Sequence, residues 1–181
     1  MTEKREIQYR LADINDLGRL LELMQLSIRT NLAEYLKPEQ VEASFELMGV
    51  DTQLIDDATY YVAEHNNQIV GCGGWSQRAT LFGGDHTFGR SPRKLDPLKE
   101  AARIRAMYTH PDFLHQGIGS AILEMSNQSA KRAGFKKLEL MATVAGEPMY
   151  FARGFLVLER LMVATSNGVK VPLSRMRRQV I

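Results

Sequence analysis

Apolar residues recur along this chain with two spacings, one typical of helices and one typical of strands. Alternation over Ile7–Leu11 predicts a first strand. Asp13 is a good helix N-cap residue, and the helical spacing after it is carried by Ile14, Leu17, Leu20, Leu21, Met24 and Ile28. A second helix is predicted to start at Pro38 and to end at Gly49. The first part of the chain therefore predicts one strand and two helices.

The middle of the chain predicts a β-hairpin followed by a long irregular segment. Leu54–Asp57 is interpreted as a turn, and Tyr60–Glu64 and Gln68–Trp75 as the two strands of the hairpin. Glycines inside the second strand predict a bulge, or a group packed closely against the backbone; they are Gly71, Gly73 and Gly74. Ser76–Ala101 shows little periodicity and is longer than most connections in compact domains. We therefore expect this segment to be functional or mobile.

A strand, a glycine turn and a helix follow one another from Arg103 onward. Arg103–Thr109 is strand-like, and Gly117 and Gly119 come after the loop Pro111–Gln116. One face of the predicted helix is formed by Ile118, Ala121, Ile122, Met125, Ser129 and Ala133. Such a helix start directs unpaired backbone N–H groups and the positive end of the helix dipole at one point. The arrangement predicts an anion-binding site, which we interpret as a cradle for a pyrophosphate.

The remaining pattern predicts one more strand, a short helix and a closing hairpin. The strand is Lys136–Met141 and the helix is Met149–Arg153. Phe155–Ala164 and Val169–Val180 are the strands of the hairpin, joined by a turn at Asn167-Gly168. Because hairpin and helical connections are mixed, the class is α+β with a mixed sheet. We expect a single domain over residues 1–181.

Composition and charge exclude several classes of function. The chain has 181 residues, 44% hydrophobic and 24% charged, and its net charge of +2 is too small to argue for nucleic acid. No apolar stretch is long enough to cross a membrane, and the polar N-terminus predicts no signal peptide. One cysteine, Cys72, and four scattered histidines cannot form a disulfide framework or a zinc site. We expect no metal, a reducing cytoplasmic setting, and a solvated face of the last strand that carries Arg175, Arg177 and Arg178.

The Gly117-x-Gly119 turn is a weak signal when it is taken alone. A Rossmann fingerprint needs a glycine or alanine where this chain has Ile122. A P-loop needs Gly-Lys-Ser/Thr, which the sequence lacks. A nucleotide-binding protein is therefore disfavoured.

Two segments together resemble a known family. Gln116-Gly117-Ile118-Gly119-Ser120 and the helix after it are similar to the acetyl-coenzyme A signature of the GNAT superfamily of N-acetyltransferases. One strand later, the segment from Tyr150 to Phe155 resembles the family's Tyr-x-x-x-Gly-Phe segment. The resemblance covers nearly the whole chain and implies a mixed sheet of about seven strands flanked by about four helices. The family pattern has arginine or glutamine where this chain has Leu114.

The resemblance implies acetyl-coenzyme A as the cofactor. Backbone amides of the glycine turn would hold its pyrophosphate, and its pantetheine arm would lie along the central strand where that strand splays from its neighbour. The cofactor-binding residues implied are Met107, Tyr108, Thr109, Leu114, His115, Gln116, Gly117, Ile118, Gly119 and Ser120. Tyr150 takes the family's position of the general acid that protonates the departing thiolate. The alternative for Tyr150 is a buried packing ring.

The general base and the acceptor are less defined. The family's glutamate position is Arg103 here, and an arginine cannot act as a base. We rank Glu100 first as base because it is closest to the central strand; the alternatives are Asp96, His86, Glu139 or a water held by backbone carbonyls. The acceptor pocket is expected to contain Ser27, Arg29, Tyr35, Trp75, Arg78 and Arg103. Arg78, Arg103 and Arg105 favour an acceptor with an anionic group.

The expected function is direct transfer of an acetyl group to a primary amine of a small molecule or a protein. The alternative is a coenzyme A-binding regulatory module without catalysis. A homodimer is possible, because Val169–Val180 is expected to be an edge strand.

Overall fold

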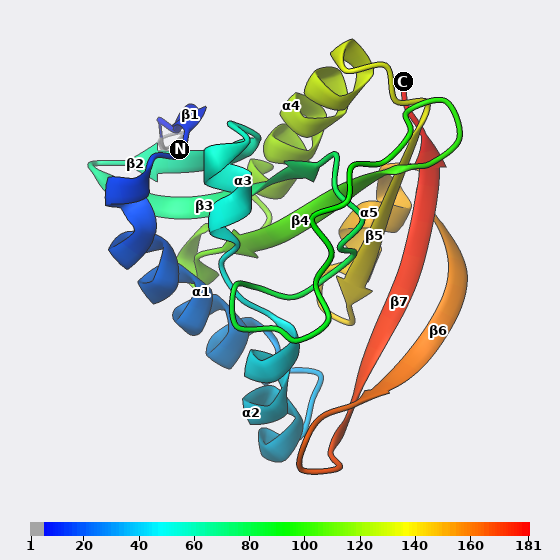
Figure 1. Ribbon diagram of the computed structural model, residues 1–181. Helices are drawn as coiled ribbons and strands as arrows, with labels where there is room; N and C mark the ends of the chain where they lie inside the picture. Colours follow the sequence, from blue (N-terminus) through cyan, green and yellow to red (C-terminus); the bar gives the residue numbers. More distant parts are fainter. Residues whose placement is uncertain (1–5) are drawn as a thin grey trace.

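A seven-stranded sheet with the order β1-β2-β3-β4-β5-β7-β6 forms the centre of the computed structural model, which describes residues 6–181 (Figure 1). Only β4 and β5 are parallel, and the other neighbours are antiparallel. The strands are β1 Gln8–Leu11, β2 Tyr60–His65, β3 Gln68–Ser76, β4 Ala102–Thr109, β5 Lys137–Thr143, β6 Leu156–Ala164 and β7 Lys170–Gln179. The helices are α1 Leu17–Asn31, α2 Pro38–Leu47, α3 Thr52–Asp56, α4 Ile118–Arg132 and α5 Glu147–Ala152. The expected α+β class with a mixed sheet is confirmed.

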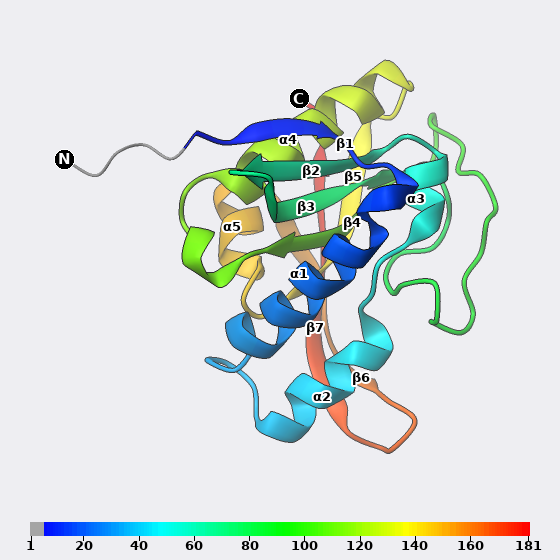
Figure 2. The same cartoon turned by 90° about the vertical axis from the view of Figure 1, so that its left-hand side faces the viewer.

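Helices cover both faces of the sheet (Figure 1, Figure 2). Tyr60 and Val62 of β2 pack with α1 and α2, whereas Ala63 and Val70 pack with Ile118 of α4. Neighbouring residues of a strand point to opposite faces, so α1 and α2 lie on one face and α4 lies on the other. The long segment 76–101 runs in front of the sheet in Figure 1, on the side of α1 and α2. No described helix is long and apolar enough to cross a membrane.

Two element assignments were wrong. Residues 54–57, expected as a turn, belong largely to the short helix α3, whose N-cap Asp51 accepts a hydrogen bond from the backbone N–H of Gln53. The last strand is not at the edge, because β7 pairs with both β5 and β6. The described sheet therefore ends at β6, and an edge strand cannot be read from hairpin order alone. Residues 1–5, part of the N-terminus from which we expected no signal peptide, lie outside the described part of the chain.

The buried face of α4 is rotated from the predicted one. Its buried residues are Ile118, Ile122, Leu123, Ser126, Asn127 and Ala130. Asn127 is buried because its side chain pairs with the backbone of Ile181, accepting from its N–H and donating to its carbonyl. The apolar pattern placed Ala133 on the buried face, but Ala133 is exposed. The pattern could not identify Asn127 as buried, because asparagine is polar.

The glycines of β3 allow close packing, as predicted. A Cβ on Gly71 would lie 2.4 Å from Cγ2 of Ile118, and one on Gly74 would lie 2.1 Å from the Thr59 carbonyl oxygen. The register between β3 and β4 shifts between Cys72 and Gly74. The glycines thus allow α4 and the residue before β2 to pack directly against β3.

The arginines of β7 do not form the solvated face that we expected. Arg178 is buried over the ring of Phe155, 5.1 Å from its centroid, and donates to the Arg153 carbonyl. Arg175 and Arg177 are half-buried and donate to the carboxylate of Glu139. The carboxylate lies on the neighbouring strand β5, which a linear reading of the last strand does not reveal.

Candidate active site

The two parallel strands at the centre of the sheet separate after a short contact. β4 and β5 pair only at Ala102 with Leu138 and at Arg103 with Glu139. Beyond these pairs lies a cavity of about 110 Å³. Its walls include Ile104, Arg105, Ala106, Met107, Tyr108, Leu140, Met141, Thr143 and Tyr150. This is the splay that the resemblance implied, and it leaves backbone groups of β4 facing an open slot.

A bulge in β4 accompanies the separation. Gly74 pairs with Arg105 and Cys72 pairs with Tyr108, so β4 has one more residue than β3 in this interval. Ala106 adopts a positive φ of 50°, which an alanine rarely does. The hydroxyl of the fully buried Tyr60 donates to the Ala106 carbonyl at 2.8 Å. A bulge bends the strand that contains it, and Tyr60 holds this bend from the α1 face.

The turn before α4 presents a continuous row of unpaired backbone N–H groups. A short 3-10 turn at Pro111–Phe113 leads into the loop, where His115 has φ 59° and the N-cap Gly117 has φ 82°. The first hydrogen bond of the helix runs from the Ala121 N–H to the Gly117 carbonyl. Within residues 6–181, the N–H groups of residues 115–120 have no acceptor. Together with the helix dipole, these N–H groups favour an anion at this point.

Side chains around this turn add one cation. Leu114, which is partly exposed, and Gln116, whose side chain donates to the Asp112 carbonyl, are both uncharged. Arg153, at the end of α5, donates through Nε to the hydroxyl of Ser120 at 3.1 Å. The guanidinium therefore lies beside the helix start and reinforces its attraction for an anion.

Tyr150 of α5 lies in the wall of the cavity between β4 and β5. It is 7% exposed, and its ring meets the edge of Phe155 at 5.7 Å. The hydroxyl has no hydrogen-bond partner among the described residues. Burial raises the pKa of Tyr150 above its ordinary value, so the hydroxyl keeps its proton at physiological pH.

The carboxylate ranked first as a base is placed unfavourably. Glu100 accepts hydrogen bonds from Arg93 at 2.8 and 3.0 Å and from the Asp96 N–H at 2.8 Å. Hydrogen bonding to Arg93, followed by the bond from Asp96, lowers the pKa of Glu100 to about 2. Glu100 also precedes the end of β4 that remains paired with β5, so it does not line the cavity. Both facts argue against Glu100 as the base.

The other candidate bases also lie outside the cavity. Glu139 is surrounded by Arg103, Arg175 and Arg177. His86 contacts the Phe45 carbonyl through Nε2, and Asp96 accepts from the Leu98 N–H. None of these three groups lines the cavity.

The expected acceptor residues are dispersed. Trp75 is buried against Phe135, with ring centroids 5.8 Å apart, and belongs to the core. Ser27 accepts from the Asn31 side chain, which also donates to the Thr109 carbonyl. Three further residues also lie away from the cavity between β4 and β5: Arg29, which stacks over Phe45, the exposed Tyr35, and Arg103, which pairs with Glu139.

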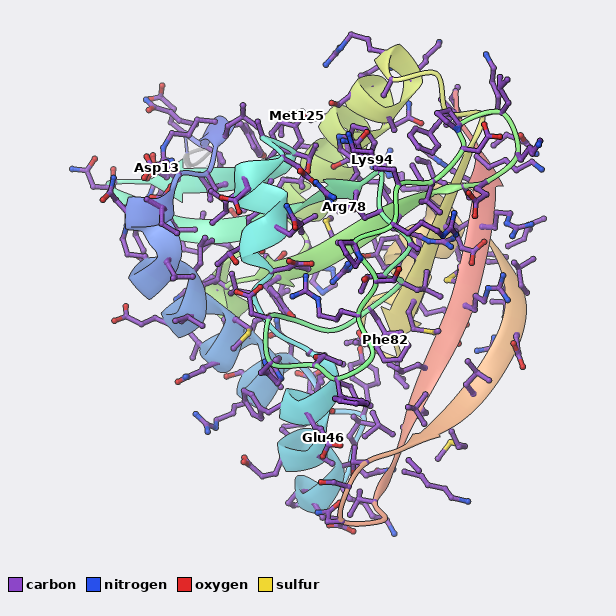
Figure 3. All side chains as sticks on the ribbon, in the orientation of Figure 1. Asp13, Glu46, Arg78, Phe82, Lys94 and Met125 are labelled. Carbon is purple, nitrogen blue, oxygen red and sulfur yellow. The ribbon has the colours of Figure 1, made fainter. Side chains whose placement is uncertain are left out.

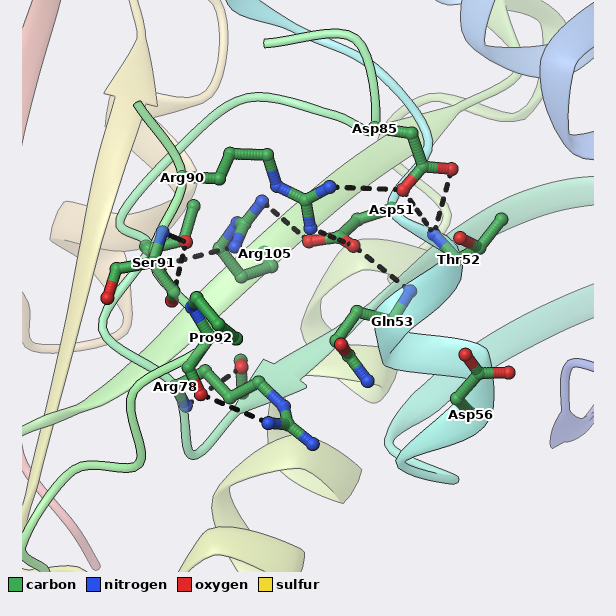
Figure 4. A pocket seen from close by; sticks show the side chains of 12 residues that line it. Asp51, Thr52, Gln53, Asp56, Arg78, Asp85, Arg90, Ser91, Pro92 and Arg105 are labelled. Atoms are coloured by element: carbon green, nitrogen blue, oxygen red, sulfur yellow. Dashed lines mark hydrogen bonds and ion pairs between the residues drawn. The ribbon is translucent and has the colours of Figure 1, made fainter. Parts of the chain in front are cut away.

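A second, polar pocket of about 230 Å³ lies between α3 and the segment 76–92 (Figure 4). Arg105 is buried there and donates to Asp51 at 2.9 Å and to the Gly83 carbonyl at 2.7 Å. Arg90 bonds to Asp51 and Asp85, and Arg78 bonds twice to Asp57 at 2.7 Å. Each arginine is neutralised by a carboxylate, so the expected preference for an anionic acceptor loses its support.

The structure adds wall residues that the sequence did not nominate. Leu47 and Met48 from the end of α2, Leu81 and Phe82 from the irregular segment, and Leu173 of β7 line the cavity between β4 and β5. Phe82, labelled in Figure 3, lines the same cavity as Met141 and Thr143 at the end of β5. These residues are apolar and come from three distant parts of the chain, so no local pattern marks them. In the sequence, the one feature that pointed to Leu81 and Phe82 was the unusual length of the connection Ser76–Ala101.

Comparisons with known proteins agree with this geometry. A family model described as an acetyltransferase (GNAT) domain matches residues 56–157, more than half of the chain. A GCN5-related N-acetyltransferase from Rhodopseudomonas palustris has a TM-score of 0.67 and 17% identity, over 99% of this chain and 98% of that one. PaiA N-acetyltransferase from Thermoplasma acidophilum, in complex with coenzyme A, has a TM-score of 0.63 and 16% identity, over 96% and 99% of the two chains.

YncA from Salmonella typhimurium, with its cofactor acetyl-CoA, has a TM-score of 0.64 and 17% identity, over 97% of this chain and 94% of that one. A comparison with curated proteins gives no match. At these identities the solved structures show a shared fold, whereas the family model covers most of the sheet and the whole glycine turn. By that match, the chain belongs to the GNAT acetyltransferase family.

Proposed function

We propose that this chain is an N-acetyltransferase that moves an acetyl group from acetyl-coenzyme A directly to a primary amine of a small molecule or a protein. The observation that carries the proposal is the row of unpaired N–H groups at residues 115–120, next to a slot that contains Tyr150. Two solved structures of this fold hold coenzyme A or acetyl-CoA.

The residues present fit the cofactor. The amides of His115–Ser120 hold the pyrophosphate, and Leu114 does not prevent this because the contacts come from the backbone. Arg153 supplies a positive charge beside them. Met107, Tyr108 and Thr109 would border the pantetheine arm along the edge of β4 that is not paired with β5. Bound there, acetyl-coenzyme A supplies an acetyl thioester whose carbonyl carbon is open to attack.

Tyr150 holds the proton that the leaving sulfur needs. Its neutral hydroxyl lies in the slot with no competing hydrogen-bond partner among the described residues. The slot also positions the amine against the thioester, which removes much of the entropic cost of their encounter. No covalent acetyl-enzyme is required, and Cys72, buried beside Tyr60, keeps a raised pKa and is no nucleophile.

Thermal stability with acetyl-coenzyme A, combined with thiol release in a panel of amines, tests the proposal. Stabilisation together with amine-dependent thiol release is expected. Stabilisation without release from any amine supports the alternative, a coenzyme A-binding regulatory module. Stabilisation by nicotinamide dinucleotides or ATP in place of acetyl-coenzyme A contradicts both.

A homodimer through the edge of β6 is a further part of the proposal, and a cytoplasmic location stays a prediction. β6 pairs only with β7 within the described chain, and Leu156, Leu158 and Met162 are exposed on it. A long apolar edge strand favours pairing with another strand. Light scattering should give twice the chain mass, and Leu158→Lys should give the monomer; a monomeric wild-type protein contradicts this part.

A further inference from the structure

The side of the slot from which an acceptor would approach is apolar. On the sheet face that carries α1 and α2, the cavity wall is formed by Leu47, Met48, Leu81, Phe82 and Leu173. The cavity is small, about 110 Å³, compared with roughly 300–1,000 Å³ for typical ligand pockets. It therefore accepts only a small uncharged group beside the reacting nitrogen.

Among the described residues, no side chain in this cavity offers an ammonium ion a counterion. Among the described residues that line it, the one charged side chain is Arg105, a cation whose donors are engaged by Asp51, Gly83 and Thr80. No carboxylate of the described chain lines the cavity. The residues contributed by α2, β5 and β7 are all uncharged. A cationic amine would thus lose its hydration and meet a guanidinium without gaining a counterion.

No described side chain there is suited to remove a proton either. The polar hydroxyls in the cavity belong to Thr143, Tyr108 and Tyr150. Tyr108 donates to the Gly49 carbonyl at 3.0 Å, and burial raises the pKa of both tyrosines. A neutral phenol is not a base near neutral pH, so neither tyrosine takes a proton from an ammonium ion.

These facts restrict the protonation state of the acceptor. A neutral amine can react without a base: the C–N bond forms, the C–S bond breaks, and the sulfur takes a proton from Tyr150. The proton that the nitrogen then loses restores the Tyr150 hydroxyl, so the exchange balances. An ammonium ion would bring one additional proton, which no group in the cavity takes up.

We propose that the acceptor is a weakly basic primary amine, such as an α-amino group, with a small uncharged substituent next to the nitrogen. This inference rests on the proposed acetyltransferase function. An α-amino group has a pKa of about 7.7–8.0 and a lysine-like alkylamine about 10.4, so their neutral fractions at pH 7.5 differ by about 200-fold.

Alaninamide, butylamine and alanine test the proposal with the full-length chain. At pH 7.5 we expect kcat/KM for alaninamide to exceed that for butylamine by about 100-fold. For butylamine, kcat/KM should rise about tenfold per pH unit until the amine itself is neutral. Alanine should react more slowly than alaninamide, because Arg105 is already paired with Asp51. Equal rates for alaninamide and butylamine, or a plateau for butylamine near pH 7, would reveal a base in the enzyme and overturn the inference.

A substitution in the cavity wall independently tests the limit on the size of the acceptor's substituent. Phe82→Ala should raise kcat/KM for phenylalaninamide at least tenfold while acetyl-coenzyme A stabilises the variant as it does the wild type. Phe88→Ala is the matched control, because Phe88 lies on the same segment and is 102% exposed. If kcat/KM for phenylalaninamide is unchanged in Phe82→Ala, the inference that the pocket limits the size of the acceptor is contradicted.

The outcomes separate the inference from the function on which it rests. Binding of acetyl-coenzyme A with transfer to butylamine but not to alaninamide overturns the inference and leaves the acetyltransferase assignment intact. Absence of stabilisation by acetyl-coenzyme A overturns the assignment itself.

Discussion

The glycine turn and the acceptor side of the slot are built in opposite ways. The turn uses backbone N–H groups of six consecutive residues, 115–120. The acceptor side uses side chains from α2, the segment 76–101 and β7. Backbone amides bind an anion whatever the side chain, so Leu114 is tolerated in the turn. The acceptor side depends on side-chain size and charge, so we place substrate choice there.

The largest effect is expected from the proton donor between these two regions. Tyr150→Phe should lower kcat about 10²-fold or more, because the leaving sulfur loses its proton source. Affinity for acetyl-coenzyme A should stay near wild type, since the ring still fills its site. Steady-state kinetics check both values, with Tyr35→Phe as an exposed control. Near wild-type turnover in Tyr150→Phe would make Tyr150 a packing residue.

The next effect should follow from straining the turn. Gly117→Val places a β-branched residue at φ 82°, a strain on the order of 1–3 kcal/mol. We expect acetyl-coenzyme A to bind about 10- to 100-fold more weakly in a calorimetric titration. Gly89→Val is a matched control, with φ 79° and equally open surroundings in the segment 76–101. If both variants bound the cofactor equally well, the turn would not be its site.

A smaller effect is expected from the hydrogen bond that holds the β4 bulge. Tyr60→Phe leaves the Ala106 carbonyl without its hydroxyl donor, which should lower the free energy of unfolding by about 1–3 kcal/mol. The KM for acetyl-coenzyme A should rise a few-fold because the slot loses its fixed edge. Tyr61→Phe is the control, since the Tyr61 hydroxyl has no hydrogen bond among the described residues. A loss of stability with unchanged KM would separate the bulge from cofactor binding.

The smallest effect is expected at Glu100. Glu100→Gln should keep kcat/KM within about twofold of wild type, because a carboxylate paired with Arg93 outside the slot takes no proton from the acceptor. Since its folded pKa of about 2 lies below the usual value, this carboxylate stabilises the fold above about pH 4.5 and loses that contribution as the pH falls toward 2. Melting temperatures of wild type and variant should therefore converge over this range. A loss of activity of 10²-fold would restore Glu100 as a base.

Short-range patterns predicted most of the fold. All seven predicted strands and all four predicted helices correspond to observed elements, because capping residues, turn glycines and apolar spacing act within a few residues. α3 was missed, since five residues give too few apolar positions for a period. The face of α4 was misplaced because a buried asparagine pairs with a chain end 54 residues away.

Long-range charge pairing accounts for most of the errors at the candidate site. From the sequence, three arginines were interpreted as free cations, yet each lies beside a carboxylate from another segment. Arg78 pairs with Asp57, Arg103 with Glu139 and Arg105 with Asp51. Trp75 was expected in a pocket wall, but the edge of Phe135 and the core cover it. No spacing rule contains these partners, because tertiary packing brings them together.

The sequence by itself determined the glycine turn, its helix and the position of Tyr150 one strand later. These features depend on backbone conformation, which neighbouring residues set. Tertiary structure alone decided that β4 separates from β5 after two pairs, that Tyr60 holds the bulge, and that the described residues on the proposed acceptor side are apolar and include no carboxylate. The physical reason is that a cavity and its charge balance are properties of distant segments in contact, and such contacts exist only in the folded chain.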